Sequence, residues 1–347
     1  MKKLVIVGGG FAGAKIARNL QKKFETVLID NKDYFEFTPS ILRAIVFPKH
    51  LKRIHVHHRD YLEKTKIVRG KAVRIKNKKI ILKDGKKIGF DYLVIASGSK
   101  YNNPIKAEGM LIADRGAGLT THNNKIGRSK SILIIGGGPV GVELAGEITD
   151  KYRGKNVTII HSGDSLMNRN SVKARNFARS FLEKRGVKMI FNERVEKKTK
   201  GFVETDKKNK FECDTAILCT GIKPNSNFID KSLLDWKGFI DVNNHLQMRG
   251  SQNIFVCGDV ASVNEEKTAQ AAEKQAEIVI KNLELMGNKN ENEKNLERYH
   301  PKKRISVTSL GRWNGILENG NFVMTGIIPA FLKGVIERRT MFRYGQI

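Results

Sequence analysis

The feature that most constrains this chain is an internal repeat. Residues 4–17 (LVIVGGGFAGAKIA) align with residues 132–145 (ILIIGGGPVGVELA), and both run from an apolar segment through GGGxxG into helix-forming residues. Further along, residues 91–98 (DYLVIASG) align with residues 214–221 (DTAILCTG). Each copy therefore starts with a strand, a glycine loop and a helix, and closes with an apolar strand. We predict an α/β fold with two Rossmann-like domains, in which parallel strands are covered on both faces.

The first glycine loop has the chemistry of a dinucleotide site. Gly8, Gly10 and Gly13 form GxGxxG between an apolar strand and a helix. In such a loop the first glycine permits a tight turn, the second lets the backbone approach a pyrophosphate, and the third lets the helix pack on the strand. Asp30 ends the second predicted strand, where a carboxylate can accept both ribose hydroxyls. The strand, the helix and the acid together make the signal specific.

The second glycine loop is followed by a different strand end. Gly136, Gly138 and Gly141 repeat the motif. The next strand (VTII) ends at His161, followed by Ser162. An acid at this position repels a 2′-phosphate, whereas His and Ser do not. The sequence therefore permits NADPH without excluding NADH. The alternative is that His161 is only a surface residue at a strand end.

Two such sites in one chain predict FAD at the first loop and NADH or NADPH at the second. A third segment supports this prediction, because NIFVCGDVAS at 253–262 is a strand that ends in Gly258 and Asp259. A helix is predicted to follow at 268–285. We expect Asp259, as an acid at a strand end, to bind a ribitol or phosphate-proximal hydroxyl of FAD. The alternative is that Gly258 and Asp259 only form a turn.

Residues 1–285 resemble the pyridine nucleotide–disulfide oxidoreductase family through five motifs in order: GGGFAG, ASG, GGGPVGVELAGE, CTG and CGD. The resemblance implies an FAD-binding domain split between 1–105 and 226–285, an inserted NAD(P)H-binding domain at 106–225, and a linker with a C-terminal membrane-docking segment at 286–347. It also implies a set of cofactor-binding residues. These are Gly8, Gly10, Phe11, Ala12, Gly13, Asp30, Lys32, Pro39, Val73, Ser97, Gly98, Gly136, Gly138, Pro139, Val140, Gly141, His161, Gly221, Gly258, Asp259 and Ala269.

The cysteines indicate which branch of this family the chain resembles. Disulfide reductases of this fold carry a CxxxxC pair on the helix after the second strand, and here that region, DNKDYFEFTPSILRAIVFP, has no cysteine. We interpret Cys219 and Cys257 as buried apolar residues. The branches without redox cysteines include type II NADH dehydrogenases, the apoptosis-inducing-factor-like ferroptosis suppressor protein, and ferredoxin or rubredoxin reductases.

Several stretches are similar to the first two branches, among them residues 30–39 and the helix predicted after residue 268. By this resemblance, Gln270 and Gln275 line the quinone end of the flavin. Glu143 follows the second glycine loop, and the resemblance places it near the nicotinamide, which we expect it to position. Alternatively, Glu143 is a first-turn acid that the helix dipole favours.

The charge of the chain indicates an anionic partner. The 64 Lys and Arg residues exceed the 35 Asp and Glu residues and give a net charge of +29. Within residues 49–87 the alternation of residue types predicts strands at 53–59 and 72–86 with one basic face. We interpret this face as attracted to anionic lipid, or as simply solvated. The four histidines of this segment have no acid or cysteine at ligand spacing, so no metal site is predicted.

The C-terminal segment predicts an amphipathic helix after Gly326. Apolar residues recur every four positions and basic residues lie at the edges of the stripe. The apolar residues are Ile327, Ile328, Phe331, Leu332, Val335 and Ile336. A helix of this kind lies flat in a bilayer interface. The alternative is a helix that packs on its own domain or on the second subunit of a homodimer.

These features predict an FAD-dependent oxidoreductase in the cytoplasm, held peripherally on the inner face of the membrane. We expect hydride to pass from NADH or NADPH to the flavin, and two electrons to pass on to a quinone. One alternative is a soluble reductase whose basic surface binds ferredoxin or rubredoxin. Another is an apoptosis-inducing-factor-like flavoprotein that binds nucleic acid. We expect no nucleic-acid partner, because no recognition motif with interleaved aromatic residues is visible.

Overall fold

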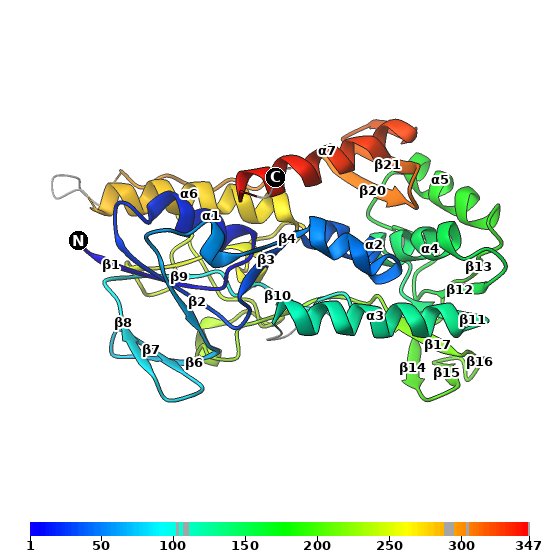
Figure 1. Cartoon of the computed structure of the whole chain (residues 1–347), viewed down its shortest axis with the longest axis horizontal. Coiled ribbons are helices and arrows are strands. Elements are labelled where there is room, and N and C mark those ends of the chain that lie inside the picture. Colours follow the sequence, from blue (N-terminus) through cyan, green and yellow to red (C-terminus); the bar gives the residue numbers. More distant parts are fainter. Residues whose placement is uncertain (102–103, 107–110, 288–294, 303–304, 346–347) are drawn as a thin grey trace.

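The computed structural model describes residues 1–101, 104–106, 111–287, 295–302 and 305–345. Two parallel sheets form the cores of two lobes, which lie at opposite ends of an elongated molecule (Figure 1). In both sheets the strand before a glycine loop is an inner strand, with a parallel neighbour on each side. The α/β fold with two Rossmann-like units is therefore confirmed.

The first lobe contains a five-stranded parallel sheet in the order β19-β9-β1-β2-β5. Its strands are β1 (Lys3–Val7), β2 (Glu25–Asp30), β5 (Lys66–Arg69), β9 (Tyr92–Ile95) and β19 (Ile254–Val256). Helices α1 (Phe11–Leu20) and α6 (Ala269–Gly287) cover one face, and an antiparallel sheet covers the other. That sheet contains β6 (Ala72–Lys76), β7 (Lys79–Leu82) and β8 (Lys87–Gly89). Both faces of the parallel sheet are thus buried.

The second lobe repeats this plan with a four-stranded parallel sheet in the order β13-β12-β11-β17. Its strands are β11 (Ser131–Ile135), β12 (Asn156–Ile160), β13 (Lys188–Ile190) and β17 (Thr215–Leu218). The helices of this lobe are α3 (Ile112–Arg128), α4 (Pro139–Lys151) and α5 (Val172–Glu183). Beside the parallel sheet lies an antiparallel sheet of β14 (Val195–Lys198), β15 (Phe202–Thr205) and β16 (Lys210–Glu212). Val203 of β15 and Cys213, which follows β16, share a buried apolar cluster with Leu133 of β11.

Short elements connect the two lobes. Strands β10 (Ser99–Lys100) and β18 (Lys223–Pro224) pair antiparallel where the chain passes between the sheets. The segment after β2 forms β3 (Tyr34–Glu36), α2 (Ile41–Val46) and β4 (His55–His57). The described residues also include the short 3-10 helices η1 (Thr38–Ser40), η2 (Pro48–Arg53), η3 (His58–Asp60), η4 (Lys231–Leu233) and η5 (Gly258–Val260).

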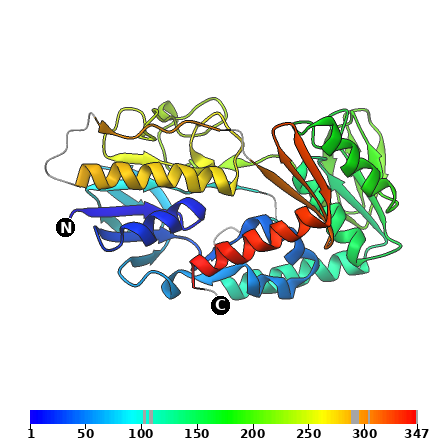
Figure 2. The same ribbon diagram turned by 90° about the horizontal axis from the view of Figure 1, so that it is seen from above.

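The C-terminal segment joins the lobes a second time. Strands β20 (Ser306–Leu310), β21 (Asn314–Asn319) and β22 (Phe322–Gly326) form an antiparallel sheet, and α7 (Ile327–Arg343) packs on it. From there α7 runs to the first lobe, as Figure 2 shows from above. Tyr344 ends it there, with its ring centroid 4.4 Å from that of Phe35 and 4.9 Å from that of Tyr61.

Most predicted elements are confirmed, with one correction. The helix predicted at 268–285 is α6, the helix after Gly326 is α7, and the strands predicted at 72–86 are β6 and β7, with Arg74 and Lys79 exposed. The strand predicted at 53–59 is wrong except at residues 55–57, because its partner β3 has only three residues and 3-10 turns flank β4. The domain boundaries stay predictions. No helix among the described residues is long and apolar enough to cross a bilayer.

Candidate functional site

The first glycine loop has the geometry of a pyrophosphate cradle. Gly8 has φ +104°, and a Cβ there would lie 2.3 Å from the carbonyl oxygen of Ala96. A Cβ at Gly13 would lie 1.8 Å from the carbonyl oxygen of Gly8. At Gly10, by contrast, a Cβ would meet nothing within 4 Å, so the backbone is open to a ligand. The loop therefore fits the diphosphate of a dinucleotide at the N-terminus of α1.

The second glycine loop repeats this geometry closely. Gly136 has φ +114°, and a Cβ there would lie 2.5 Å from the carbonyl oxygen of Cys219. A Cβ at Gly141 would lie 1.9 Å from the carbonyl oxygen of Gly136, while Gly138 is open. The chain thus carries two cradles built on the same steric pattern.

The strand registers show which residues of the two copies are equivalent. Val7 pairs with Ile29 in the first sheet, and Ile135 pairs with Ile160 in the second. The amide of Gly8 donates to the carbonyl of Ile29 at 2.8 Å, and the amide of Gly136 donates to the carbonyl of Ile160 at the same distance. The next residues, Asp30 and His161, therefore occupy equivalent positions, as predicted.

Asp30 is buried and charged. Its Oδ2 accepts a hydrogen bond from the amide of Gly9 at 2.7 Å and lies 3.4 Å from Nε2 of His58, while Oδ1 accepts from the amide of Lys32. Burial alone would raise the pKa of Asp30, but the hydrogen bond from His58 and the charge of Lys32 outweigh it and lower that pKa below 3.8. Sequence reasoning missed His58, because no local pattern links it to a residue that far away.

Asp259 meets two further side chains that sequence reasoning missed. Its Oδ2 accepts from the hydroxyl of Ser99 at 2.6 Å and from Nζ of Lys106 at 3.0 Å. Burial alone would raise the pKa of Asp259, but Lys106 and Ser99 outweigh it and lower that pKa below 3.8. Ser99 directly follows the predicted residues Ser97 and Gly98, so the motif could have been extended to include it. No sequence pattern points to Lys106.

Asp259 should make the fold sensitive to acid. A carboxyl with a lowered pKa in the folded state stabilises the fold fully above its unfolded pKa, near 3.8, and this contribution is lost as the pH falls through the folded pKa. We therefore expect the Tm of the Asp259→Asn variant to change less than that of the wild type between about pH 5 and pH 3. Thermal unfolding followed by circular dichroism measures this. Asp84→Asn, at an exposed acid, is the control, and parallel curves for all three proteins would contradict the prediction.

One cavity of about 2110 Å³ joins the two cradles. All but three of the residues predicted from the sequence line it. Two of the three, Gly13 and Gly141, are the glycines at which helix and loop pack. The third, Gln275, lies outside the lining and is buried. Its Oε1 accepts from the amide of Gly258, and its Nε2 donates to Glu265, both at 2.7 Å. Gln275 therefore supports the turn that carries Asp259 and does not face a quinone in the cavity.

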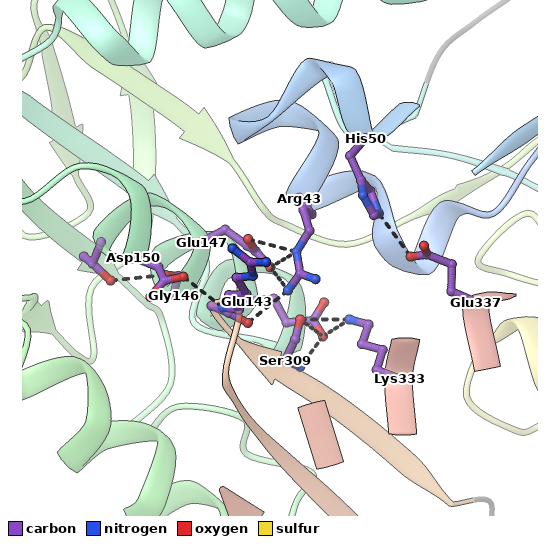
Figure 3. Close-up of polar contacts among 12 residues, drawn as sticks. Arg43, His50, Glu143, Gly146, Glu147, Asp150, Ser309, Lys333 and Glu337 are labelled. Atoms are coloured by element: carbon purple, nitrogen blue, oxygen red, sulfur yellow. Dashed lines mark hydrogen bonds and ion pairs between the residues drawn. The ribbon is translucent and has the colours of Figure 1, made fainter. Parts of the chain in front are cut away.

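Glu143 lies on the wall of the cavity and is held by the C-terminal segment. Its Oε1 accepts from Nζ of Lys333 at 2.6 Å and from the amide of Ser309 at 2.7 Å (Figure 3). The side chains of Glu143 and Lys333 are only 11% and 15% exposed. Glu143 lies beyond the first turn of α4, so the alternative of a first-turn acid at the helix dipole does not apply.

The same face of α4 receives the turn between β20 and β21. Gly146 lets this turn approach, since a Cβ there would lie 2.8 Å from the backbone nitrogen of Gly311. Arg43 of α2 donates to Glu147 at 2.9 Å and to the carbonyl of Gly311 at 3.0 Å (Figure 3). Nearby, His50 pairs with Glu337 of α7 at 3.1 Å. Partly or fully buried polar contacts therefore join the nucleotide-binding helix, the segment around α2 and the C-terminal segment.

This arrangement, with two glycine cradles on two parallel sheets that open into one cavity, defines a protein that binds two dinucleotides. A family model for pyridine nucleotide-disulphide oxidoreductases matches residues 2–276, and the chain belongs to this family. Enzymes of the family use FAD and NAD(P)H. The fit of both cradles agrees with this, and the protein is an FAD-dependent NAD(P)H oxidoreductase of this family.

Similar proteins cover nearly the whole chain. Apoptosis-inducing factor homolog A of Dictyostelium discoideum is 33% identical over 96% of this chain and 88% of its own length. Ferroptosis suppressor protein 1 of Homo sapiens is 31% identical over 95% of this chain and 92% of its own length. Among solved structures, NDH2 from Plasmodium falciparum in complex with NADH covers 99% of this chain and 96% of its own, with a TM-score of 0.81 at 16% identity. That structural likeness shows the fold.

Proposed function

We propose that this oxidoreductase passes electrons from NAD(P)H through FAD to a quinone, and that it works peripherally on the inner face of a membrane. The observation that carries the proposal is the position of α7. Lys333, Ile336 and Thr340 of this helix line the cavity. The names of relatives add support, since NDH2 and a sulfide:quinone oxidoreductase share the fold with TM-scores of 0.81 and 0.79.

The outer face of α7 is apolar and exposed. The exposed fractions are 66% for Ile327, 64% for Ile328, 73% for Phe331, 44% for Val335 and 71% for Phe342. Arg338 and Arg339 are also exposed and suit anionic headgroups. One helix therefore borders the cavity on one side and offers an apolar face on the other. A quinone dissolved in the bilayer would reach the cavity along this helix without crossing water.

The residues around the cavity suit an external acceptor. When bound, FAD would accept hydride from NAD(P)H and deliver electrons to the acceptor. Cys219 and Cys257 supply no thiolate, because burial raises the pKa of each to about 12. Glu143 is positioned by Lys333 at the second cradle, where it would orient the nicotinamide. Gln270 and Ala269 line the cavity at the start of α6 and remain our candidates for the quinone end.

Reoxidation of the reduced enzyme tests the acceptor. The holoenzyme is reduced anaerobically with one equivalent of NADH or NADPH and is mixed in a stopped-flow instrument with a short-chain quinone or with ferredoxin. We expect the quinone to reoxidise the flavin and ferredoxin to do so much more slowly. Faster reoxidation by ferredoxin would assign the enzyme to the soluble reductases and overturn the proposal.

Two charges on the outer face of α7 should release the protein from membranes. Transfer of two large apolar side chains into lipid contributes about 3 kcal/mol or more, so Ile328→Glu with Phe331→Glu should lower binding to anionic vesicles by about a hundredfold. Flotation with phosphatidylglycerol vesicles measures the bound fraction. The matched control is Leu111→Glu with Val172→Glu, two exposed apolar residues of the second lobe. Flotation that is unchanged in the α7 variant would refute docking, and loss of a dimer instead would assign the face to a second subunit.

A further inference from the structure

The two nucleotide sites differ at one equivalent position. Asp30 in the first site is a buried carboxylate, whereas His161 takes its place in the second. A carboxylate accepts the ribose 2′-hydroxyl and repels a 2′-phosphate. The ring of His161 packs over the second cradle, since a Cβ at Gly137 would lie 3.0 Å from its Cγ. Its Nε2 lies 3.0 Å from Oδ1 of Asn168.

Two arginines flank His161. Arg169 follows Asn168 in a loop that folds back on the cradle, where the amide of Met167 donates to the carbonyl of Gly137 at 2.8 Å. Arg194 follows Glu193, whose amide donates to the carbonyl of His161 at 3.2 Å. Both arginines line the cavity and are exposed. Within the described part of the chain, neither guanidinium has a hydrogen bond or an ion pair to a protein group.

The neighbouring carboxylates of Glu193 and Asp164 accept hydrogen bonds from nearby polar side chains. Glu193 is buried, and its two oxygens accept from the hydroxyl of Thr205 at 2.7 Å and from Nδ2 of Asn209 at 3.0 Å. Asp164 is exposed and does not line the cavity, and its Oδ1 accepts from the hydroxyl of Ser165 at 2.9 Å and from Nδ2 of Asn168 at 3.5 Å. The strand end therefore offers two free guanidinium groups and an imidazole, and no acid takes the place of Asp30.

We infer that the second site binds the 2′-phosphate of NADPH through Arg169, Arg194 and His161, and therefore prefers NADPH to NADH. Guanidinium groups recognise phosphate by charge-assisted, often bidentate hydrogen bonds, and a ribose hydroxyl provides no equivalent anion. The inference rests on the proposed function only in taking NAD(P)H as the reductant. It adds a preference for NADPH over NADH, which the geometry of the glycine loop alone does not determine.

Binding to the holoenzyme tests the inference directly. The probes are adenosine 2′,5′-bisphosphate, which carries the 2′-phosphate, and 5′-AMP, which lacks it. By calorimetry we expect the bisphosphate to bind about tenfold or more tightly, with an advantage that shrinks as salt increases. Arg169→Gln with Arg194→Gln should weaken the bisphosphate by about tenfold to a hundredfold and change 5′-AMP by less than about twofold.

Two further variants make the test specific. Arg128→Gln with Arg153→Gln removes the same charge from exposed positions of the same lobe that do not line the cavity, and it should leave both affinities unchanged. His161→Asp restores the acid of the first copy and should shift flavin reduction from NADPH towards NADH. Equal affinities of the wild type for the two probes, or equal weakening of both by the arginine variant, would overturn the inference. If neither NADH nor NADPH reduces the flavin, the proposed function is wrong. The binding measurements with the two adenosine probes still test the 2′-phosphate site in that case.

Discussion

Gly141→Ala should greatly weaken reduction of the flavin by NAD(P)H while FAD stays bound. The new Cβ would lie 1.9 Å from the carbonyl oxygen of Gly136, a contact that only a shift of α4 away from the loop can relieve. Because the first cradle is a separate copy in the other lobe, its FAD should remain. We expect the affinity for NAD(P)H to fall by about a hundredfold or more. Titration of flavin bleaching with NADH and NADPH, with FAD content measured after desalting, records both quantities.

The equivalent glycine of the first loop allows a matching experiment. Gly13→Ala, with its Cβ 1.8 Å from the carbonyl oxygen of Gly8, should lose FAD instead. Gly118→Ala in α3 is the control, since its Cβ would meet nothing within 4 Å and alanine favours a helix by about 1 kcal/mol. Normal reduction of the Gly141→Ala variant by NAD(P)H would show that the second loop is not the nicotinamide nucleotide site.

Glu143→Gln and Lys333→Met should each slow flavin reduction by about tenfold or more, and the double variant should be no slower than the slower single. The two groups form one nearly buried pair at 2.6 Å, and loss of either partner leaves an uncompensated charge at a cost of about 3–5 kcal/mol. The remaining partner then moves, and the nicotinamide loses its fixed neighbour. Stopped-flow reduction at saturating NADPH, with FAD content as a check, measures the effect.

A control variant on the same helix distinguishes loss of this ion pair from a general loss of positive charge. Arg338→Met removes an exposed cation from α7 and should leave the reduction rate unchanged. If Glu143→Gln reduces as fast as the wild type, Glu143 has no part in positioning the nicotinamide. If the two single effects simply add, the groups act separately, and α7 has no influence on the nucleotide site through Lys333.

Local patterns predicted the two glycine loops and the strands and helices around them. The glycines of both loops, the strand ends at Asp30 and His161, and the helix at α6 lie where short-range spacing places them. These features depend on steric limits within a few residues, namely the turn at a positive φ and the close approach of helix to strand. The length of β4 could not be predicted in the same way. The sequence predicted a strand at 53–59, but only residues 55–57 form one, because the partner strand β3 has three residues.

Contacts between residues far apart in the chain escaped prediction altogether. Lys106 reaches Asp259, Arg43 reaches Glu147, and Lys333 reaches Glu143 from more than 100 positions away in each case. Gln275 has the spacing of a quinone-lining residue, yet its amide is taken up by the turn at Gly258. No periodicity or motif encodes such pairs.

The sequence by itself determined the two dinucleotide units, the order of their motifs and the amphipathic character of the C-terminal helix. Each of these is a local pattern, repeated or periodic within about 20 residues. Only the tertiary structure decided that α7 reaches the nucleotide-binding helix through the ion pair of Lys333 with Glu143 and turns its apolar face outward. The physical reason is that a buried ion pair or an exposed face depends on which elements pack together, and packing brings together residues that the chain keeps apart.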